Sequence, residues 1–385
     1  MTQLSRLATL GWAKESVAGT WLAPTSAIPF TKADFEDVTD PIEDKSYRGN
    51  DTDLQGLYAG VQQVTWDIEL LGYPDILGSF LRAMIGPDTV TAGVTTTLST
   101  TTVAGATSIS TAATIPMGSV VSIGTAGTLE YFISGTPSGS GPYTIPVSAT
   151  SNPSGLLYGH TSSVQVSTQT THTFKQSPTN WPLPTYSFTV FDTNTTLGYS
   201  YARITDLAIK IDPKAGVSLD GKFLTQGASA QSTTSETYNT IQPMLGWQWA
   251  QTNSGGSSTR GLSLDLTVKR AGEAIHASTG VQGPREIFTG VLDADGSYKA
   301  IYENQTDFAL FQNYQQLPLT AALTKPASIG GESVAFTMNK SGWKTAKRDL
   351  SQPYTQMTFD ISGIYNSTDG GAMSAVLMNW VAAQY

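Results

Sequence analysis

Carboxylates that stand two residues apart are the groups of this sequence best placed to do chemistry. Asp51/Asp53 and Asp293/Asp295 resemble the oxygen-rich start of a calcium-binding loop. Neither pair is followed by the glutamate that completes such a loop, so turns and loops are the favoured interpretation and we predict no metal site. A glycosidase needs two carboxylates about 5–10 Å apart in a cleft, and nothing in the sequence points to such a pair.

Three histidines, His160, His172 and His276, are the other candidates for catalysis. His160 and His172 lie in a tract without acidic neighbours, so we expect ordinary surface or core positions for them. The sequence contains no nucleophile elbow, paired-histidine zinc motif, phosphate-binding loop or dinucleotide-binding glycine motif. We therefore predict no enzyme activity, no catalytic residue and no cofactor.

The composition excludes several other classes of protein. Charged residues make up 13% of the 385 residues, and the formal net charge of -9 is opposite to that of a protein that grips nucleic acid by its backbone. The chain has no cysteine, which excludes disulfides and thiolate metal sites. No apolar run approaches the roughly 20 residues of a membrane span, and the N-terminus lacks the apolar core of a signal peptide. We expect a soluble protein without membrane insertion.

Alternating apolar and polar residues predict a mainly β chain with one or two short helices, an α+β or all-β fold. The clearest pattern is an antiparallel hairpin from Asp206 to Gln226, with its turn at 212–216. Another strand is predicted at Val64–Leu70. We interpret Asp293–Gly296 as a hairpin turn between two further strands.

Two helices are predicted at the points where the periodicity changes. One begins at Pro74 and ends at Gly86, with an apolar stripe that packs on a sheet. Thr306 is expected to cap the other, a short helix that bears Phe308, Phe311 and Tyr314.

A sharp change of composition divides the chain. Between Asp88 and Lys175 the one charged residue is Glu130, and the tract is rich in Thr, Ser and Gly with short alternating pieces. We predict a small all-β module at 91–171, inserted between the two parts of a main domain at 1–90 and 172–385. No internal repeat at the spacing of solenoids or propellers is evident.

Two regions carry charges of opposite sign. The stretch from Asp34 to Asp53 is acidic and has no consistent period, so we predict a long loop; lysines and an arginine cluster around Trp343. Solvated faces explain both regions, and the alternative hypothesis is that they meet between neighbouring subunits. The candidate interface residues are Asp34, Glu36, Asp37, Asp40, Glu43, Asp44, Lys340, Lys344, Lys347 and Arg348.

Several segments resemble the tail tube (major tail) proteins of long-tailed, non-contractile (siphovirus-type) bacteriophages. They are 10–20 (LGWAKESVAGT), Arg48-Gly49, 74–78 (PDILG), 243–249 (PMLGWQW) and the strand at 333–340. The likeness covers roughly 1–90 and 172–385, and the order of the elements carries more weight than any one motif. The inserted tract, with 118–124 and Glu130-Tyr131, resembles a small β module that recurs in phage structural proteins.

The resemblance implies a tail-tube-type β-sandwich whose copies oligomerise into a closed inner β-barrel. Hexameric rings, with about four strands from each subunit, would stack into the conduit for DNA ejection. About 24 strands spaced ~4.8 Å and tilted ~40° close a barrel roughly 45–50 Å across. The candidate residues facing this lumen are the polar positions of alternating strands: Asp67, Glu69, Lys210, Asp220, Lys222, Asp265, Lys269 and Asp360.

The resemblance also implies partners and a location. The partners are further copies of the chain, a tape-measure protein, the tail terminator, baseplate or distal tail proteins, and DNA in transient, non-specific passage. The location is the virion tail, assembled in the cytoplasm of the host bacterium. A different class remains open: a β-sandwich adhesin or carbohydrate-binding surface protein, for which eight Trp and 16 Tyr could supply stacking platforms. A glycosidase is a distant third.

Overall fold

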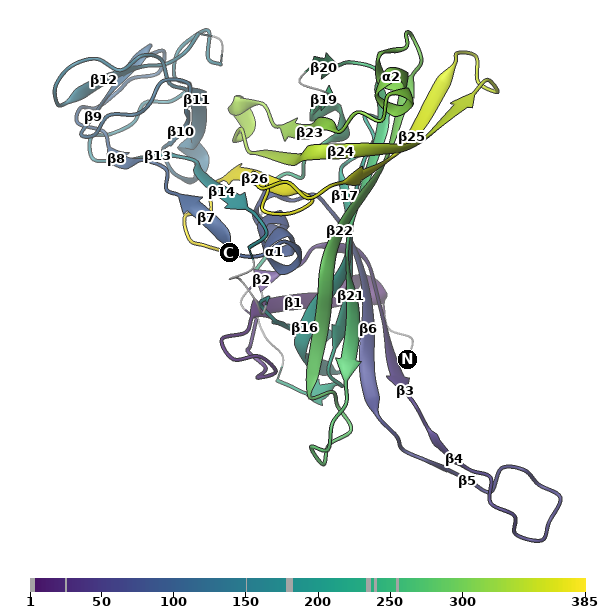
Figure 1. The fold of residues 1–385 in the computed structure, drawn as a ribbon. Coiled ribbons are helices and arrows are strands. Elements are labelled where there is room, and N and C mark those ends of the chain that lie inside the picture. The colour runs from purple at the N-terminus through teal and green to yellow at the C-terminus, as the bar shows by residue number, and fades with distance from the viewer. Residues whose placement is uncertain are drawn as a thin grey trace.

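The computed structural model describes residues 4–24, 26–149, 151–177, 183–232, 237–238, 241–253 and 256–385. These residues are mainly β and include two α-helices, α1 (Pro74–Met84) and α2 (Thr306–Gln312) (Figure 1). Short 3-10 helices occur at η1 (Ser5–Leu7), η2 (Ala126–Thr128), η3 (Gly246–Gln248) and η4 (Ala327–Ile329). The described part contains no helix that is long and apolar enough to span a membrane.

One wide antiparallel sheet organises the main body (Figure 1). Seven successive strand pairs hold it together, and six strands separate its two outer members. Within the described residues the sheet does not close into a barrel. In spatial order its strands are β3 (Phe30–Thr39), β6 (Gln62–Leu71), β17 (Ser218–Thr225), β16 (Thr196–Ile211), β21 (Gly261–Ile275), β22 (Glu286–Ile301), β25 (Gln356–Gly363) and β24 (Ser333–Asp349).

Shorter strands and α1 cover the apolar face of this sheet. Aromatic rings join the layers: the Trp66 and Phe188 centroids are 5.3 Å apart, and Phe188 and Phe223 are 5.1 Å apart. Strands β16 and β24 belong to both layers, because their first halves pair with β15 and β23 and their second halves with β17 and β25. The shorter strands are β1 (Thr9–Lys14), β2 (Ser26–Ala27), β7 (Asp88–Thr91), β14 (Thr170–Phe174), β15 (Tyr186–Phe191), β18 (Ser229–Ala230), β19 (Trp249–Asn253), β20 (Gly256–Ser258), β23 (Leu317–Thr324) and β26 (Ser374–Asn379).

The strongest sequence patterns are confirmed. The predicted hairpin is β16–β17, with Lys210 opposite Ser218 beside the turn, and the strand predicted at Val64–Leu70 is β6. Helix α1 begins at Pro74, as predicted, and buries Ile76, Leu77, Phe80, Leu81 and Met84. Helix α2 begins at Thr306, which is its first helical residue and not its cap; the Asn304 Oδ1 accepts a hydrogen bond from the Thr306 N–H.

The hairpin turn predicted at Asp293–Gly296 is wrong. Strand β22 runs without a break from Glu286 to Ile301, and Asp295 pairs with Thr267 on one side and Ser362 on the other. Leu292, Ala294, Tyr298 and Ala300 are all buried, so the period of two continues through the Asp-Gly signal. Burial of one face outweighs the local turn preference of these residues.

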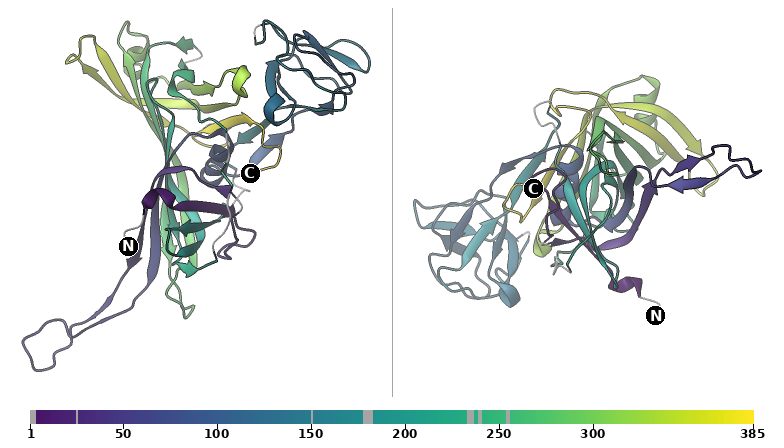
Figure 2. Two further views of the ribbon diagram at one scale, coloured as in Figure 1. Left: turned by 180° about the vertical axis from the view of Figure 1, so that it is seen from behind. Right: turned by 90° about the horizontal axis from the view of Figure 1, so that it is seen from below.

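The long loop predicted from Asp34 to Asp53 is also wrong. Its first part is β3, which pairs with β6, and its continuation is a thin arm built from β4 (Ile42–Asp44) and β5 (Gly56–Tyr58). Figure 2 shows this arm projecting away from the body in both views. An edge strand and an arm bury neither face fully, so their side chains need no apolar alternation and the sequence shows none.

The tract predicted as an inserted module has a core of its own. Strands β8 (Thr95–Thr97), β10 (Val120–Ile123), β11 (Glu130–Ile133) and β13 (Gln165–Thr168) form one sheet, and β9 (Ser108–Thr111) pairs with β12 (Tyr143–Pro146). Val121, Ile123, Phe132, Ile145 and Val166 are fully buried between them. The module meets the body at η4, where the Gln169 side-chain amide and the Trp380 indole N–H both donate to the Gly330 carbonyl.

The domain boundaries at 90 and 172 stay a prediction, which excision of the module tests. Thr91 of β7 and Thr171 of β14 are opposed in an antiparallel pair, so an Asn-Gly turn in place of residues 92–170 can join them as a tight hairpin. We expect the shortened chain to fold with its main-body β signal and a cooperative thermal transition, measured by circular dichroism. An insoluble or non-cooperative product would show that the tract is an integral part of the main core.

Candidate assembly surface

The register of the wide sheet determines which side chains share a face, because opposed residues of an antiparallel pair point to the same side. Three rows of opposed residues cross the sheet. The first is Asp34, Asp67, Lys222, Asp206, Lys269 and Asp293. The second is Lys32, Glu69, Asp220, Ala208, Thr267, Asp295 and Ser362. The third is Ser218, Lys210, Asp265, Ser297, Asp360 and Thr345.

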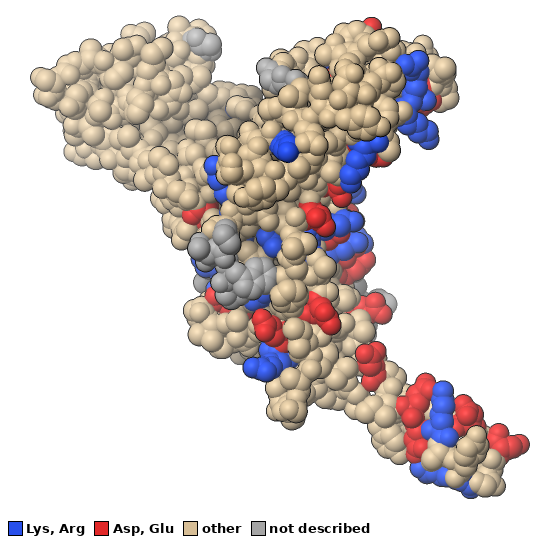
Figure 3. Space-filling model, in the orientation of Figure 1, with Lys and Arg blue, Asp and Glu red and all other residues tan. Residues whose placement is uncertain are grey.

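All eight residues predicted to face a lumen stand in these rows. We call this side of the sheet the polar face. Its residues come from eight strands that are far apart in sequence, and the alternating residues between them, such as Trp66, Leu219 and Tyr298, are buried on the other side. Figure 3 shows lysines and acidic residues concentrated along this side of the molecule, whereas the surface of the inserted module is almost uncharged. That the polar face lines a lumen stays a prediction.

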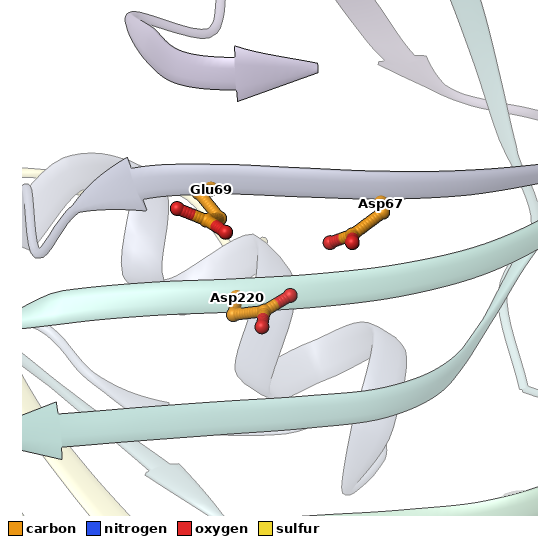
Figure 4. A group of neighbouring side chains, drawn as sticks. All are labelled: Asp67, Glu69 and Asp220. Carbon is orange, nitrogen blue, oxygen red and sulfur yellow. The ribbon is translucent and has the colours of Figure 1, made fainter. Parts of the chain in front are cut away.

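A group of three carboxylates stands out on the polar face (Figure 4). Asp67 and Glu69 come from β6 and Asp220 from the neighbouring β17, with one ligand oxygen of each within 4.8 Å of the others. The ammonium group of Lys32 lies 3.0 Å from Asp67 Oδ2 and 3.8 Å from Glu69 Oε1. A lysine therefore supplies the positive charge that this cluster faces.

The carboxyl groups of this cluster differ in acidity. Burial raises the pKa of Asp220 to about 6, reinforced by the adjacent Asp67. Burial acts in the same direction on Asp67, but hydrogen bonds from Lys32 and Asp220 outweigh it and hold the pKa of Asp67 below its usual value. One oxygen of each aspartate is buried and otherwise lacks a donor among the described residues. A proton on Asp220 can satisfy both oxygens, which agrees with the raised pKa of Asp220.

The candidate interface charges lie at the two outer edges of the sheet. Asp34, Glu36 and Asp37 are on β3, which pairs with β6 and has no strand on its other side within the described residues. Residues 342–349 of β24 pair with β25 and likewise have an open outer side there. In one chain the two groups of opposite charge do not meet, because six strands separate them.

The remaining members of the two groups have different surroundings. Asp40 follows β3, while Glu43 and Asp44 lie on the arm, where Lys45 and Arg48 pair with them. Lys344 is 3.2 Å from Asp295 on the polar face. Arg348 points to the opposite face, with its guanidinium 4.4 Å from the centre of the Tyr302 ring. Lys340 precedes the open part of β24, and its carbonyl accepts a hydrogen bond from the Ile364 N–H.

The expectation that His160 and His172 lack acidic neighbours is wrong. His160 Nε2 is 2.7 Å from Glu130 Oε1, and His172 Nδ1 is 2.7 Å from Asp88 Oδ2. All four side chains are buried. His172 also bonds the Val381 carbonyl, so it ties β14 to β7 and to the C-terminal segment. These contacts fit the core positions that were predicted.

Sequence reasoning missed several members of the polar face. Lys32 precedes the predicted loop and was assigned to no strand, and Asp295 was assigned to a turn. Lys299 also belongs here, because it is opposed to Ser263 and Thr358 in a fourth row. The period of two through 286–301 was the signal that could have revealed both β22 residues.

The acidity of Asp220 gives a pH-dependent prediction. Its pKa in the folded chain is above the unfolded value, so its contribution to stability is full below about pH 4 and is lost as pH rises through about 6. Asp220→Asn should therefore stabilise the isolated chain above pH 6 by about 1 kcal/mol, after allowance for solvent screening, and give no gain at pH 4. Thermal or urea unfolding at both pH values measures this difference. The control is Asp293→Asn on the same face, and a pH-independent effect of Asp220→Asn would contradict the assignment.

Comparison with known proteins agrees with this architecture. A family model described as phage tail tube protein matches residues 5–355, which include every strand of the wide sheet except β25. None of the curated proteins matches the chain. The family is one of structural components of the virion tail. The chain belongs to the phage tail tube protein family.

Proposed function

We propose that this chain is the tail tube subunit of a siphovirus-type phage and that its copies join edge to edge into closed rings. The rings stack into a conduit that DNA crosses during ejection. The observation that carries the proposal is the open sheet, whose two outer edges, β3 and the second half of β24, have no further strand partner in the described part of the chain and bear opposite charges. Unpaired backbone groups at a sheet edge favour the addition of another strand.

The polar face suits the lining of such a conduit. Carboxylates and lysines are mixed in its rows. Among the eight predicted positions five are acidic and three are basic: Asp67, Glu69, Asp220, Asp265 and Asp360 against Lys210, Lys222 and Lys269. A mixed surface with an acidic excess hydrates well and repels phosphates, so DNA can slide without being held. The apolar face of the same sheet is used for the core.

The ring that the family resemblance implies has six-fold symmetry, with four strands in each of its six repeats. Twenty-four strands spaced about 4.8 Å and tilted about 40° give a backbone diameter of roughly 45–50 Å, wide enough for duplex DNA after side chains are added. Closure also removes both open edges, which otherwise invite aggregation.

The arm supports stacking of the rings. It projects beyond the body (Figure 2) and carries exposed apolar side chains, among them Ile42 and Leu57, which are 61% and 60% exposed. Glu43 and Asp44 are paired with Lys45 and Arg48 within the arm, which leaves these apolar groups as its contact surface for a neighbouring ring. The further partners proposed are a tape-measure protein in the lumen, tail terminator and distal tail or baseplate proteins, with assembly in the host cytoplasm.

Charge reversal at the basic edge tests the proposal. Lys344→Glu combined with Lys347→Glu should weaken each edge contact by about 1–2 kcal/mol, roughly tenfold in association constant, because like charges then face the acidic β3 edge. Tube formation is measured by negative-stain microscopy and sedimentation over a range of protein and salt concentrations. We expect a higher critical concentration and a reversed salt dependence.

The matched control for this experiment is Lys214→Glu, an exposed lysine in the turn at 212–216, away from both edges. This variant should assemble like the unmodified chain. Assembly of the double variant at an unchanged critical concentration would contradict the edge-to-edge contact. Dispersed monomers of the unmodified chain at high concentration would contradict the function itself.

A further inference from the structure

The wide sheet and the shorter strands that cover it contain two units with the same topology. In the first unit the pairings are β1–β2, β1–β15, β15–β16, β16–β17, β17–β6 and β6–β3. In the second they are β19–β20, β19–β23, β23–β24, β24–β25, β25–β22 and β22–β21. A helix follows the corresponding strand in each unit, α1 after β6 and α2 after β22 (Figure 1). Six pairings recur in the same chain order.

Irregularities of the strands recur at the same places. The register of β16–β17 shifts between Ile204 and Asp206, and that of β24–β25 shifts between Trp343 and Thr345. Further upstream, β15–β16 shifts after the Tyr186/Ala202 pair and β23–β24 after the Leu317/Ser341 pair. These landmarks align Ala202, Ile204 and Asp206 with Ser341, Trp343 and Thr345 without insertion or deletion. β-bulges are position-specific features, so their agreement supports equivalence of the two units.

The duplication is invisible in the sequence. Equivalent positions hold unlike residues; for example, the pairings place Trp66 where the second unit has Gly296. The inserted module and its flanking strands also separate α1 from β15 in the first unit alone. Topology and register reveal what residue identity does not.

One junction joins the two units inside the chain. Strand β16 is the member of the first unit that borders the second unit in the sheet, and it pairs with β21 of the second unit. Asp206 is opposed to Lys269, Ala208 to Thr267 and Lys210 to Asp265. At the outer edges of the sheet, β24 is the equivalent of β16 and β3 is the equivalent of β21. The internal junction is therefore a template for a contact between β24 of one copy and β3 of the next.

Transfer of the internal register gives specific pairs across this contact. Lys347 takes the place of Ala208, and Glu36 takes the place of Thr267, so Lys347 is opposed to Glu36 of the next copy. On the other face Arg348 is opposed to Phe35, diagonal to Asp37. Opposite charges thus meet on both sides of the contact. The Lys210–Asp265 pair of the internal junction is replaced by Asp349 opposite Asp34, so these two carboxylates face each other at the end of the contact.

The exposure of apolar side chains agrees with this register. Leu350 is 72% exposed and Phe35 is 39% exposed in the single chain. Both lie on the apolar side of their edges, where the transferred register covers them with the next copy. Neither 30–39 nor 342–349 contains a proline, so neither edge is blocked against strand addition.

We infer that three copies of this chain, not six, close each ring, with β24 of one copy paired to β3 of the next in the register of the β16–β21 junction. The inference rests on the proposed function. Each chain supplies two four-stranded units, so three chains provide the six units and 24 strands of the expected barrel. Six chains would supply 48 strands and about double the diameter, while two would supply 16, the size of a porin that passes small solutes.

Disulfide trapping tests the inference directly, since the chain has no native cysteine. Glu36→Cys with Lys347→Cys should crosslink neighbouring copies in assembled tubes. Under non-reducing denaturing electrophoresis the covalent ladder should end at about 122 kDa, three times the chain mass of 40.8 kDa. The matched control is Ala208→Cys with Thr267→Cys, the equivalent opposed pair of the internal junction, which should crosslink within one chain. Asp37→Cys with Lys347→Cys places the thiols on opposite faces and should not crosslink.

The outcomes distinguish an error in the number of chains from an error in the proposed function. Tubes with a ladder that extends to six would overturn the three-chain ring and leave the proposed function intact. Tubes without any crosslink would overturn the transferred register. Mass per ring of unmodified tubes, from scanning transmission microscopy and the axial repeat, counts the chains independently if the cysteine variants do not fold. Failure of the unmodified chain to form tubes or rings would instead count against the proposed function.

Discussion

Unpaired backbone groups at the two ends of one sheet are the constraint on which this structure depends. Among the described residues each inner strand pairs with two neighbours over at least part of its length, whereas β3 and the second half of β24 pair on one side only. Most folds shield such edges with proline, short strands or a covering segment. This chain leaves both edges long, and gives them opposite charges. In the proposed ring, self-association satisfies both edges at once.

The two faces of this sheet have different environments. Register places one set of side chains toward the core and the other toward solvent, and a shift of one residue would exchange them. The large aromatic residues of the core hold this register in place, since Trp66, Phe188 and Phe223 bridge the layers. The charged rows can therefore vary in detail without loss of the fold, provided that their alternation is kept. Asp67 and Asp220 lie close together there, with the Lys32 ammonium group 3.0 Å from Asp67 Oδ2.

Local patterns predicted the parts of the fold that depend on burial of one face. Hairpin β16–β17, strand β6 and helix α1 follow from periodicity, and the eight polar positions share a face because period two permits little else. Prediction was wrong where a local signal competed with long-range pairing: Asp293–Gly296 reads as a turn but lies inside a strand held on both sides. The partners of His160 and His172 come from strands distant in sequence. The duplicated topology was hidden because its halves share pairings and bulges, not residues.

Amide hydrogen exchange at the two edges is the most direct measurement of edge-to-edge closure. In the free subunit, residues 33–38 and 345–350 should exchange rapidly, since their outward amides have no strand partner. In assembled tubes the same segments should become protected, by about 100-fold or more, while the turn at 212–216 keeps its rate. Tubes in which both edges still exchange as in the free subunit would contradict a closed barrel of paired strands.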